Sequence, residues 1–86
     1  MNAVDFLEYI STNERGRSLM ARIALNTLGF AGQCPVDIVE LRKLSQKDRA
    51  VVSGFLDWVI VNGDYRYADY AEAQLRALAA IKGLAR

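Results

Sequence analysis

Residues 45–61, SQKDRAVVSGFLDWVIV, decide the fold of this chain because they carry its clearest helical pattern. Ser45 is followed three residues later by Asp48, the spacing of a capping box that opens a helix. Apolar side chains then recur at helical spacing until Asn62 and Gly63, a pair suited to positive φ and therefore to a helix end. A strand competes only at residues 59–61, where β-branched side chains cluster. The stretch therefore predicts one long α-helix.

The apolar face of this helix is wider than a one-sided contact needs. Its apolar side chains sweep roughly 200°, whereas a helix that packs on one side needs only about 100°. Two interpretations stay open: the helix is central and covered on two sides, or part of the arc faces a second protein. Phe55 and Leu56 lie in the middle of the arc, and both interpretations bury them. The arc consists of Val51, Val52, Phe55, Leu56, Trp58, Val59 and Ile60.

Helical spacing also fills the rest of the chain. Residues 3–11 and 18–28 give two helices separated by a polar turn at Gly16, and the second has a wide apolar arc of its own. Gly29, Gly32 and Pro35 end that second helix. Further capping pairs open helices at Asp37, with Glu40, and at Asp69, with Glu72. The sequence therefore predicts an all-α fold, a compact bundle of four to five helices in a single domain spanning residues 1–86.

The segment NGDYRYADYAEAQ, residues 62–74, holds three tyrosines. Tyr70 shares a helical stripe with Leu75 and is expected in the core, whereas Tyr67 fits the core or the surface equally well. Tyr65 lies outside the stripe and is expected in an exposed loop. Trp58 lies at the edge of its arc, where a tryptophan caps a core or anchors a partner. The candidate partner-binding residues are accordingly Trp58, Tyr65 and Arg66.

Composition limits the chemistry of this chain. Its 86 residues carry a net charge of +1, are 52% hydrophobic and include no histidine and one cysteine. Catalysis by Ser-His-Asp or Cys-His sets and histidine-containing metal sites are therefore excluded within one chain. The glycines fit no phosphate-binding fingerprint. We expect no enzyme activity, no catalytic residues, no cofactor and no bound metal.

The same features bear on location. No apolar run approaches the roughly 18 to 20 residues that span a membrane. Asp5 and Glu8 precede every basic residue, so we expect no secretory signal. A single cysteine cannot form an internal disulfide, which is typical of the cytoplasm. We therefore expect a cytoplasmic protein that does not bind membranes.

Basic side chains suggest a second kind of partner. Residues 14–49 hold seven bases against four acids, whereas residues 57–72 hold one base against four acids. Residues 37–61 match a helix-turn-helix arrangement in outline, although their turn lacks glycine. The backbone donors at the start of a helix also favour anions. The candidate anion or nucleic-acid contacts are Arg15, Arg17, Arg22, Lys47 and Arg49.

Three segments resemble a family of small uncharacterised helical proteins carried on bacterial plasmids, integrative elements and prophages. They are RGRSLMARIAL at 15–25, VDIVELRKLSQKDRAVVSGFLDWVI at 36–60 and DYRYADYAEAQL at 64–75. The family has paired tryptophans where this chain has Asn26 and Thr27, and Tyr-Pro-Asp where it has residues 65–67. The resemblance implies a mobile-element setting, in which small proteins often bind and block a host complex, anti-CRISPR inhibitors among them.

Together these features predict a non-enzymatic protein–protein interaction module, which binds another protein or itself as a homodimer. The alternative is a small nucleic-acid-binding or transcription-regulatory protein that uses segment 37–61.

Overall fold

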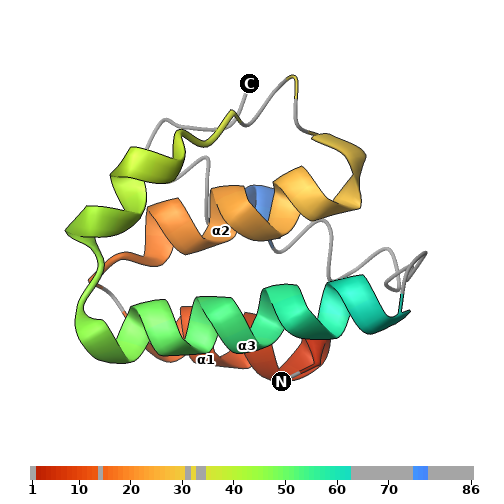
Figure 1. Cartoon of the computed structure of the whole chain (residues 1–86), viewed down its shortest axis with the longest axis horizontal. Helices are drawn as coiled ribbons and strands as arrows, with labels where there is room; N and C mark the ends of the chain where they lie inside the picture. Colours follow the sequence, from red (N-terminus) through yellow and green to blue (C-terminus); the bar gives the residue numbers. More distant parts are fainter. Residues whose placement is uncertain (1, 14, 31, 33–34, 63–74, 78–86) are drawn as a thin grey trace.

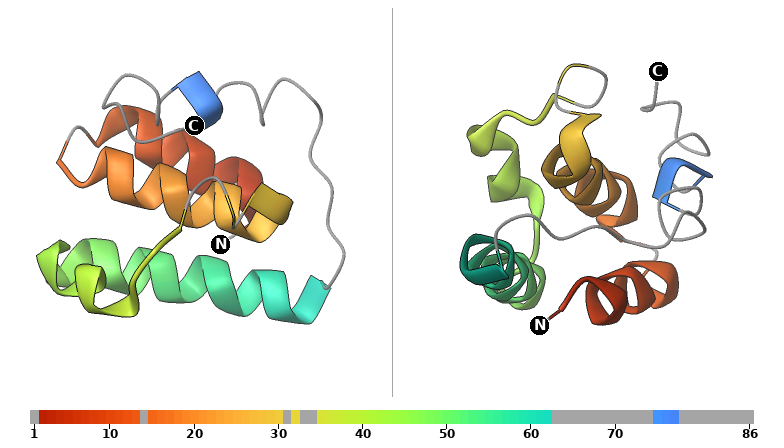
Figure 2. Two further views of the ribbon diagram at one scale, coloured as in Figure 1. Left: turned by 90° about the horizontal axis from the view of Figure 1, so that it is seen from above. Right: turned by 90° about the vertical axis from the view of Figure 1, so that its right-hand side faces the viewer.

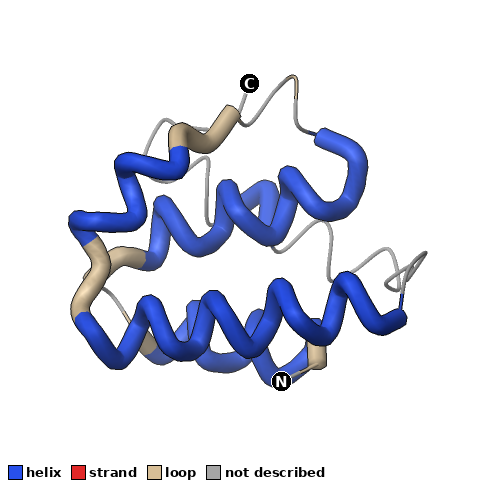
Figure 3. Tube along the Cα trace, viewed as in Figure 1, coloured by secondary structure: helices blue, strands red, loops and turns tan. Residues whose placement is uncertain are grey.

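A computed structural model describes residues 2–13, 15–30, 32, 35–62 and 75–77 of the chain. The prediction of an all-α fold is confirmed, and the part of the chain that the structure describes contains no strand (Figure 3). Residues 75–77 are also helical. In chain order the other elements are α1 (Ala3–Thr12), α2 (Arg17–Leu25), the π-helical turn η1 (Asn26–Phe30), the 3-10 helix η2 (Ile38–Lys43) and α3 (Gln46–Asn62) (Figure 1).

Helix α1 begins where its sequence supplies a cap. The side chain of Asn2 accepts a hydrogen bond from the backbone N–H of Asp5 at 2.8 Å, which satisfies a donor that the first helical turn leaves without a partner. Phe6 and Ile10 are fully buried, whereas Val4 is exposed. The helix therefore packs on one side only.

Helix α2 is the central helix. Seen end-on, it lies between η2 and the helical residues 75–77, with α1 and α3 along its other side (Figure 2). Its regular part ends at Leu25, and η1 follows with Gly29 at φ 102°, a left-handed conformation that favours glycine. The predicted helix end at Gly29 is therefore confirmed, although through a widened last turn. The buried residues of α2 are Leu19, Met20, Ala21, Ile23, Ala24 and Leu25.

Helix α3 lies at the outside of the bundle. Of its wide apolar arc only Val52 and Phe55 are buried. Leu56 and Trp58 are half-buried against the core, and Ile60 is exposed. The interpretation that both wide-arc helices are central therefore holds for α2 and is wrong for α3, and the chain's own core buries Leu56 only in part.

In each of the two capping pairs within the described residues, the first residue caps a helix. The acid three positions later binds a residue of another helix instead: Glu40 binds Arg22, and Asp48 binds Tyr9. Asp37 accepts from the N–H of Val39 at 3.0 Å, and Ser45 accepts from the N–H of Asp48 at 3.1 Å. Six residues then form a 3-10 helix where an α-helix was expected, since short helical runs readily adopt this tighter form. Helix α3 begins at Gln46 as predicted and ends at Asn62.

The turn between α1 and α2 requires glycine at position 16. Gly16 has φ 76°, and a Cβ placed there would lie 3.0 Å from Cδ2 of Leu44 and 3.3 Å from Oδ2 of Asp48. Both the conformation and the space therefore exclude a side chain without rearrangement. The turn, the end of η2 and the first turn of α3 consequently meet at one end of the bundle.

Leu75 is fully buried, as its place in the stripe of the predicted last helix indicated. Tyr65, Arg66, Tyr67, Tyr70 and the capping pair at Asp69 lie outside the described residues.

Candidate interaction surface

An apolar groove runs between η2 and α3, and we call it the η2–α3 groove. One part has a volume of about 360 Å³ and is lined by Leu41, Leu44, Arg49, Val52, Ser53, Leu56 and Asp57. A second part of about 210 Å³ extends it towards α2 and is lined by Ile23, Asn26, Thr27, Val36, Ile38, Leu41, Val52 and Leu56. Leu41, Val52 and Leu56 line both parts, so the groove is continuous. Its floor is mainly aliphatic, and such surfaces commonly bind other proteins.

Large apolar side chains also project into solvent on η2 and α3. Ile38 on η2 is 79% exposed, and Ile60 and Val61 on α3 are 77% and 83% exposed. Single exposed apolar residues need no explanation, but Ile38 lines the groove itself. The apolar surface of the groove therefore continues on to η2.

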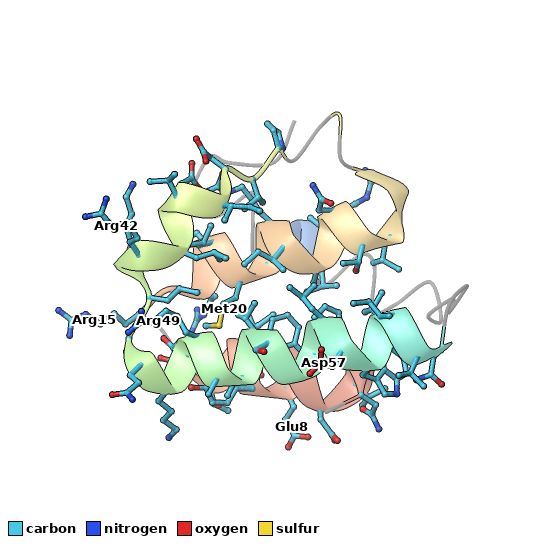
Figure 4. All side chains as sticks on the ribbon, in the orientation of Figure 1. Glu8, Arg15, Met20, Arg42, Arg49 and Asp57 are labelled. Carbon is cyan, nitrogen blue, oxygen red and sulfur yellow. The ribbon has the colours of Figure 1, made fainter. Side chains whose placement is uncertain are left out.

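The η2–α3 groove has opposite charges at its two ends. Arg49 lines it near the first turn of α3, and Asp57 lines it eight residues further along the same helix (Figure 4). Both side chains belong to exposed residues. Ser53 lies midway between them, so the three form an i, i+4, i+8 row on α3. A partner in the groove would therefore meet a cation at one end and an anion at the other.

The η2 wall of the groove is held in place by an ion pair. Nη2 of Arg22 on α2 lies 2.7 Å from Oε2 of Glu40 on η2, and Nη1 of Arg22 donates to the carbonyl of Pro35 at 3.0 Å. None of the residues of η2 is buried, so packing alone fixes this helix weakly. Nε of Arg22 is buried without a hydrogen-bond partner, which offsets part of the stabilisation.

A polar cavity of about 360 Å³ lies where α1 ends and α3 begins. Oδ1 of Asp48 accepts hydrogen bonds from the phenol of Tyr9 at 2.5 Å and from the amide of Asn13 at 2.7 Å. Asp48 is only 4% exposed, and buried carboxylates need such donors. The ammonium group of Lys47 lies 5.9 Å from the centre of the Tyr9 ring, a cation–π distance. This cluster ties α1 to α3.

The hydrogen bond to Asp48 raises the pKa of the Tyr9 phenol above its usual value of 10.0, and burial and the negative charge of Asp48 act in the same direction. A neighbouring anion and a low-dielectric environment both disfavour the phenolate. Tyr9 is therefore a neutral donor at physiological pH.

Three of the candidate anion contacts, Arg15, Arg17 and Arg22, are close in sequence but make different contacts in the structure. The guanidinium of Arg17 donates to the carbonyls of Ile10 and Ser11, both at 3.2 Å, and so caps the end of α1. Arg22 is engaged with Glu40 and Pro35, as described above. Arg15 is exposed and lines the polar cavity together with Lys47. The structure therefore does not gather the three arginines into one site.

Three of the candidate contacts, Arg15, Lys47 and Arg49, belong to a basic group at one end of the molecule. Arg15, Arg42 and Arg49 lie at the same end in Figure 4, which is also the end where η2 passes into α3. Lys43 and Lys47 flank the same junction, and all five residues are exposed. Asp48 is the acid nearest to this junction in sequence, and it is buried. We call Arg15, Arg42, Lys43, Lys47 and Arg49 the basic end.

Trp58 packs on the protein's own core. Its ring lies 6.3 Å from that of Phe55, which in turn stacks on Phe6 at 4.2 Å, so three aromatic rings join α1 to α3. Trp58 is partly buried in this stack and is not among the residues that line the groove, and its role as a partner anchor stays a prediction. The other two proposed partner-binding residues, Tyr65 and Arg66, lie outside the described residues.

Of the residues that line the groove, the sequence indicated Arg49 as a candidate contact and Val52 and Leu56 as part of the wide arc, but it did not indicate the η2 side of the groove. Among the described residues, no group of three potential metal-ligating side chains lies together. No helix in the described ranges has the length and apolar character needed to cross a membrane. Comparisons with protein-family models, curated proteins and solved structures found no match to this chain.

Proposed function

We propose that this chain is a non-enzymatic protein-interaction module that binds its partner in the η2–α3 groove. The observation that carries the proposal is the continuous aliphatic floor of the groove, in which Leu41 and Leu56 are only partly buried beside the buried Val52. Apolar surface of this kind gains free energy when a partner removes it from water.

The second support is the position of α3. A helix with a wide apolar arc at the outside of a bundle leaves part of that arc without cover from the other helices that the structure describes. Ile60 and Val61 remain exposed although they continue the arc. A fold that needed α3 only for its own stability would require a narrower stripe, so the additional apolar surface favours a partner.

The polar cavity supports a structural role better than catalysis. Asp48, the one buried carboxylate among the residues that the structure describes, already accepts from Tyr9 and Asn13. Histidine, the commonest general base, is absent from the sequence. The cavity therefore holds the bundle together, and the groove is left as the surface for function.

Site-specific photocrosslinking tests this proposal. A photoreactive benzophenone side chain is introduced at Ser53, which lines the groove, and at Glu8, which is exposed on α1, as the matched control. Both proteins are irradiated in cell extract, and adducts are identified by mass spectrometry. The proposal expects a defined protein adduct from position 53 only, and its loss when Leu56→Asp is added to a chain that keeps its helical circular dichroism. Equal adducts from both positions, or none from position 53, would contradict it.

The basic end favours a second candidate, a small nucleic-acid-binding protein that contacts phosphates there. Its five exposed cations come from the turn before α2, from η2 and from α3. Binding to phosphates weakens steeply with salt because counterions are released. A gel shift with duplex DNA at two salt concentrations tests this candidate. If the chain binds nucleic acid, binding should be lost at high salt and in an Arg42→Ala, Lys43→Ala double variant. An absence of binding at low salt would rule this candidate out.

The mobile-element setting, inhibition of a host complex and a cytoplasmic location also remain proposals. They rest on the family resemblance and on the cysteine content, and the genes that neighbour this one are the observation that tests them.

A further inference from the structure

The charged row on α3 is self-complementary, which identifies one occupant for the groove. Arg49 and Asp57 lie four residues to either side of Ser53, or about 6 Å in each direction along the helix axis. If a second α3 lies antiparallel across the first with a two-fold axis at Ser53, each Arg49 faces an Asp57. A closed two-fold dimer requires this kind of surface, which is complementary to itself.

The shape of this part of α3 also permits a close approach. Ala50 and Ser53 are exposed and small, and a Cβ placed on Gly54 would meet nothing within 4 Å. Rows of the i, i+4 type on two helices pack into one another at a crossing angle of about −50°, the commonest class in globular proteins. Two copies of α3 can therefore approach closely at the centre of the contact, with the charged pairs on either side.

The second copy would cover the apolar part of the groove. Val52 and Leu56 line the groove on the same helix as the charged row, and Leu41 and Ile38 form its η2 side. In the antiparallel arrangement, Leu56 of one copy lies at the level of Ala50 of the other copy. The two residues match because each is three positions from Ser53, on opposite sides of it. Both copies thereby bury aliphatic surface that the single chain leaves in water.

We propose that the η2–α3 groove is the interface of a homodimer, in which two α3 helices cross antiparallel at Ser53 and Arg49 of each copy pairs with Asp57 of the other. This inference rests on the proposed function, since it names a second copy of the chain as the partner. It also assigns a role to two charges at the margin of an apolar surface: they fix the register and exclude the parallel arrangement, in which like charges would meet.

A charge-reversal experiment tests the register directly. In the R49D variant the row is acidic at both ends, and in the D57R variant it is basic at both ends. Each variant alone sets like charges opposite one another in both symmetry-related pairs. We expect each to dissociate about tenfold or more readily than the parent chain in light scattering. Both residues are exposed, so thermal melting monitored by circular dichroism should show that each variant stays folded.

Mixing the two variants restores every pair, because each acidic row then faces a basic one. Native mass spectrometry should detect the R49D–D57R heterodimer in preference to either homodimer, and the doubly reversed chain should dimerise like the parent. A cysteine at Ser53, in a Cys34→Ser background, should form a disulfide-linked dimer on oxidation, whereas a cysteine at Glu8 should not.

Three results would overturn the inference: a parent chain that stays monomeric at high concentration, reversed variants that dimerise as well as the parent, or a mixture without preference for the heterodimer. A monomeric parent that still crosslinks another protein from position 53 would leave the proposed function intact and exclude only the second copy. Association that requires added DNA would instead favour the basic end as the binding surface.

Discussion

The phenol of Tyr9 donates a hydrogen bond to the carboxylate of Asp48, 39 residues further along the chain, at a distance of 2.5 Å. Asn13 donates to the same oxygen, Oδ1. The bond links α1 to the first turn of α3. The stacked rings of Phe6 and Phe55 provide a second link between the two helices. The position of α3, and with it one wall of the groove, therefore depends on a polar contact as well as on the apolar core.

Replacing Tyr9 by phenylalanine tests this link. The variant leaves a buried carboxylate with one donor fewer, and we expect a loss of about 1 to 2 kcal/mol in the free energy of unfolding at neutral pH. Urea denaturation followed by circular dichroism measures it. Ser11→Ala, at an exposed position on the same helix, is the control and should change stability by less than about 0.5 kcal/mol. Equal stability of the Tyr9→Phe variant and the parent would mean that the bond contributes nothing.

The same contact gives a pH dependence. Because the folded protein has a Tyr9 pKa above the ordinary value of 10.0, the unfolded chain loses the phenolic proton first as the pH rises. The stabilisation from Tyr9 is therefore fully present below about pH 10 and decreases above it. The stability difference between the parent and Tyr9→Phe should shrink as denaturation is repeated at increasing pH above 10. A difference that stays constant to high pH would contradict the raised pKa.

The ion pair between Arg22 and Glu40 is expected to keep η2 in place. In Arg22→Ala, Glu40 loses its cation and the carbonyl of Pro35 loses a donor. Hydrogen exchange should then show at least tenfold faster exchange at the amides of Glu40 and Leu44, which bond within this segment. Arg42→Ala, an exposed change on the same helix, is the control. Unchanged protection in Arg22→Ala would mean that packing of Leu41 and Leu44 suffices.

Replacement of Gly16 and of Gly54 by alanine should change the stability of the chain in opposite directions. Gly16→Ala forces a side chain into a left-handed conformation against Leu44 and Asp48, and we expect a loss of about 1 to 3 kcal/mol. Gly54→Ala meets no atom and replaces glycine within a helix, so we expect a gain of up to about 1 kcal/mol. Thermal unfolding at low protein concentration compares them as monomers. A Gly16→Ala chain as stable as the parent would show that the turn can rearrange.

Phe55 and Leu56 are adjacent but differ in burial. Phe55 is fully buried between Phe6 and Trp58, so Phe55→Ala should cost about 3 to 5 kcal/mol. Leu56 is half-buried on the groove floor, so Leu56→Ala should cost about 1 to 2 kcal/mol at low concentration. Chemical denaturation of both variants measures the two losses in the free energy of unfolding. Equal losses would place Leu56 in the core and would remove the floor of the groove.

The sequence predicted those features of the fold that depend on neighbouring residues. The caps at Asp37 and Ser45, the turn at Gly16 and the end of α3 at Asn62 all depend on residues within one helical turn. It could not reveal that Glu40 and Asp48, which match capping boxes, bind Arg22 and Tyr9 instead. Those partners lie 18 and 39 residues away. A carboxylate in a first helical turn can satisfy either role, and only the packing of the helices decides between them.

The candidate site was predictable only in part. The wide arc on residues 51–60 indicated surplus apolar surface, but which side of α3 remains open depends on where α1 and η2 pack. Tryptophan often anchors partners, which makes Trp58 a candidate from the sequence, but in the structure its ring stacks on Phe55. Arg49 was indicated only as a basic residue near the start of a helix, and Asp57 had no local signal, since the proposed relation between the two appears only across a two-fold axis.

The most direct test of the central claim is to locate the interaction surface by NMR. Amide spectra are compared for the chain at low concentration, at high concentration, and with the protein captured from position 53. The account predicts that self-association or the captured partner shifts the signals of Val52, Ser53 and Leu56, while those of Asp5 and Glu8 on the outer face of α1 stay unchanged. Spectra that do not change under either condition, or shifts confined to α1, would contradict the claim that the η2–α3 groove binds a protein.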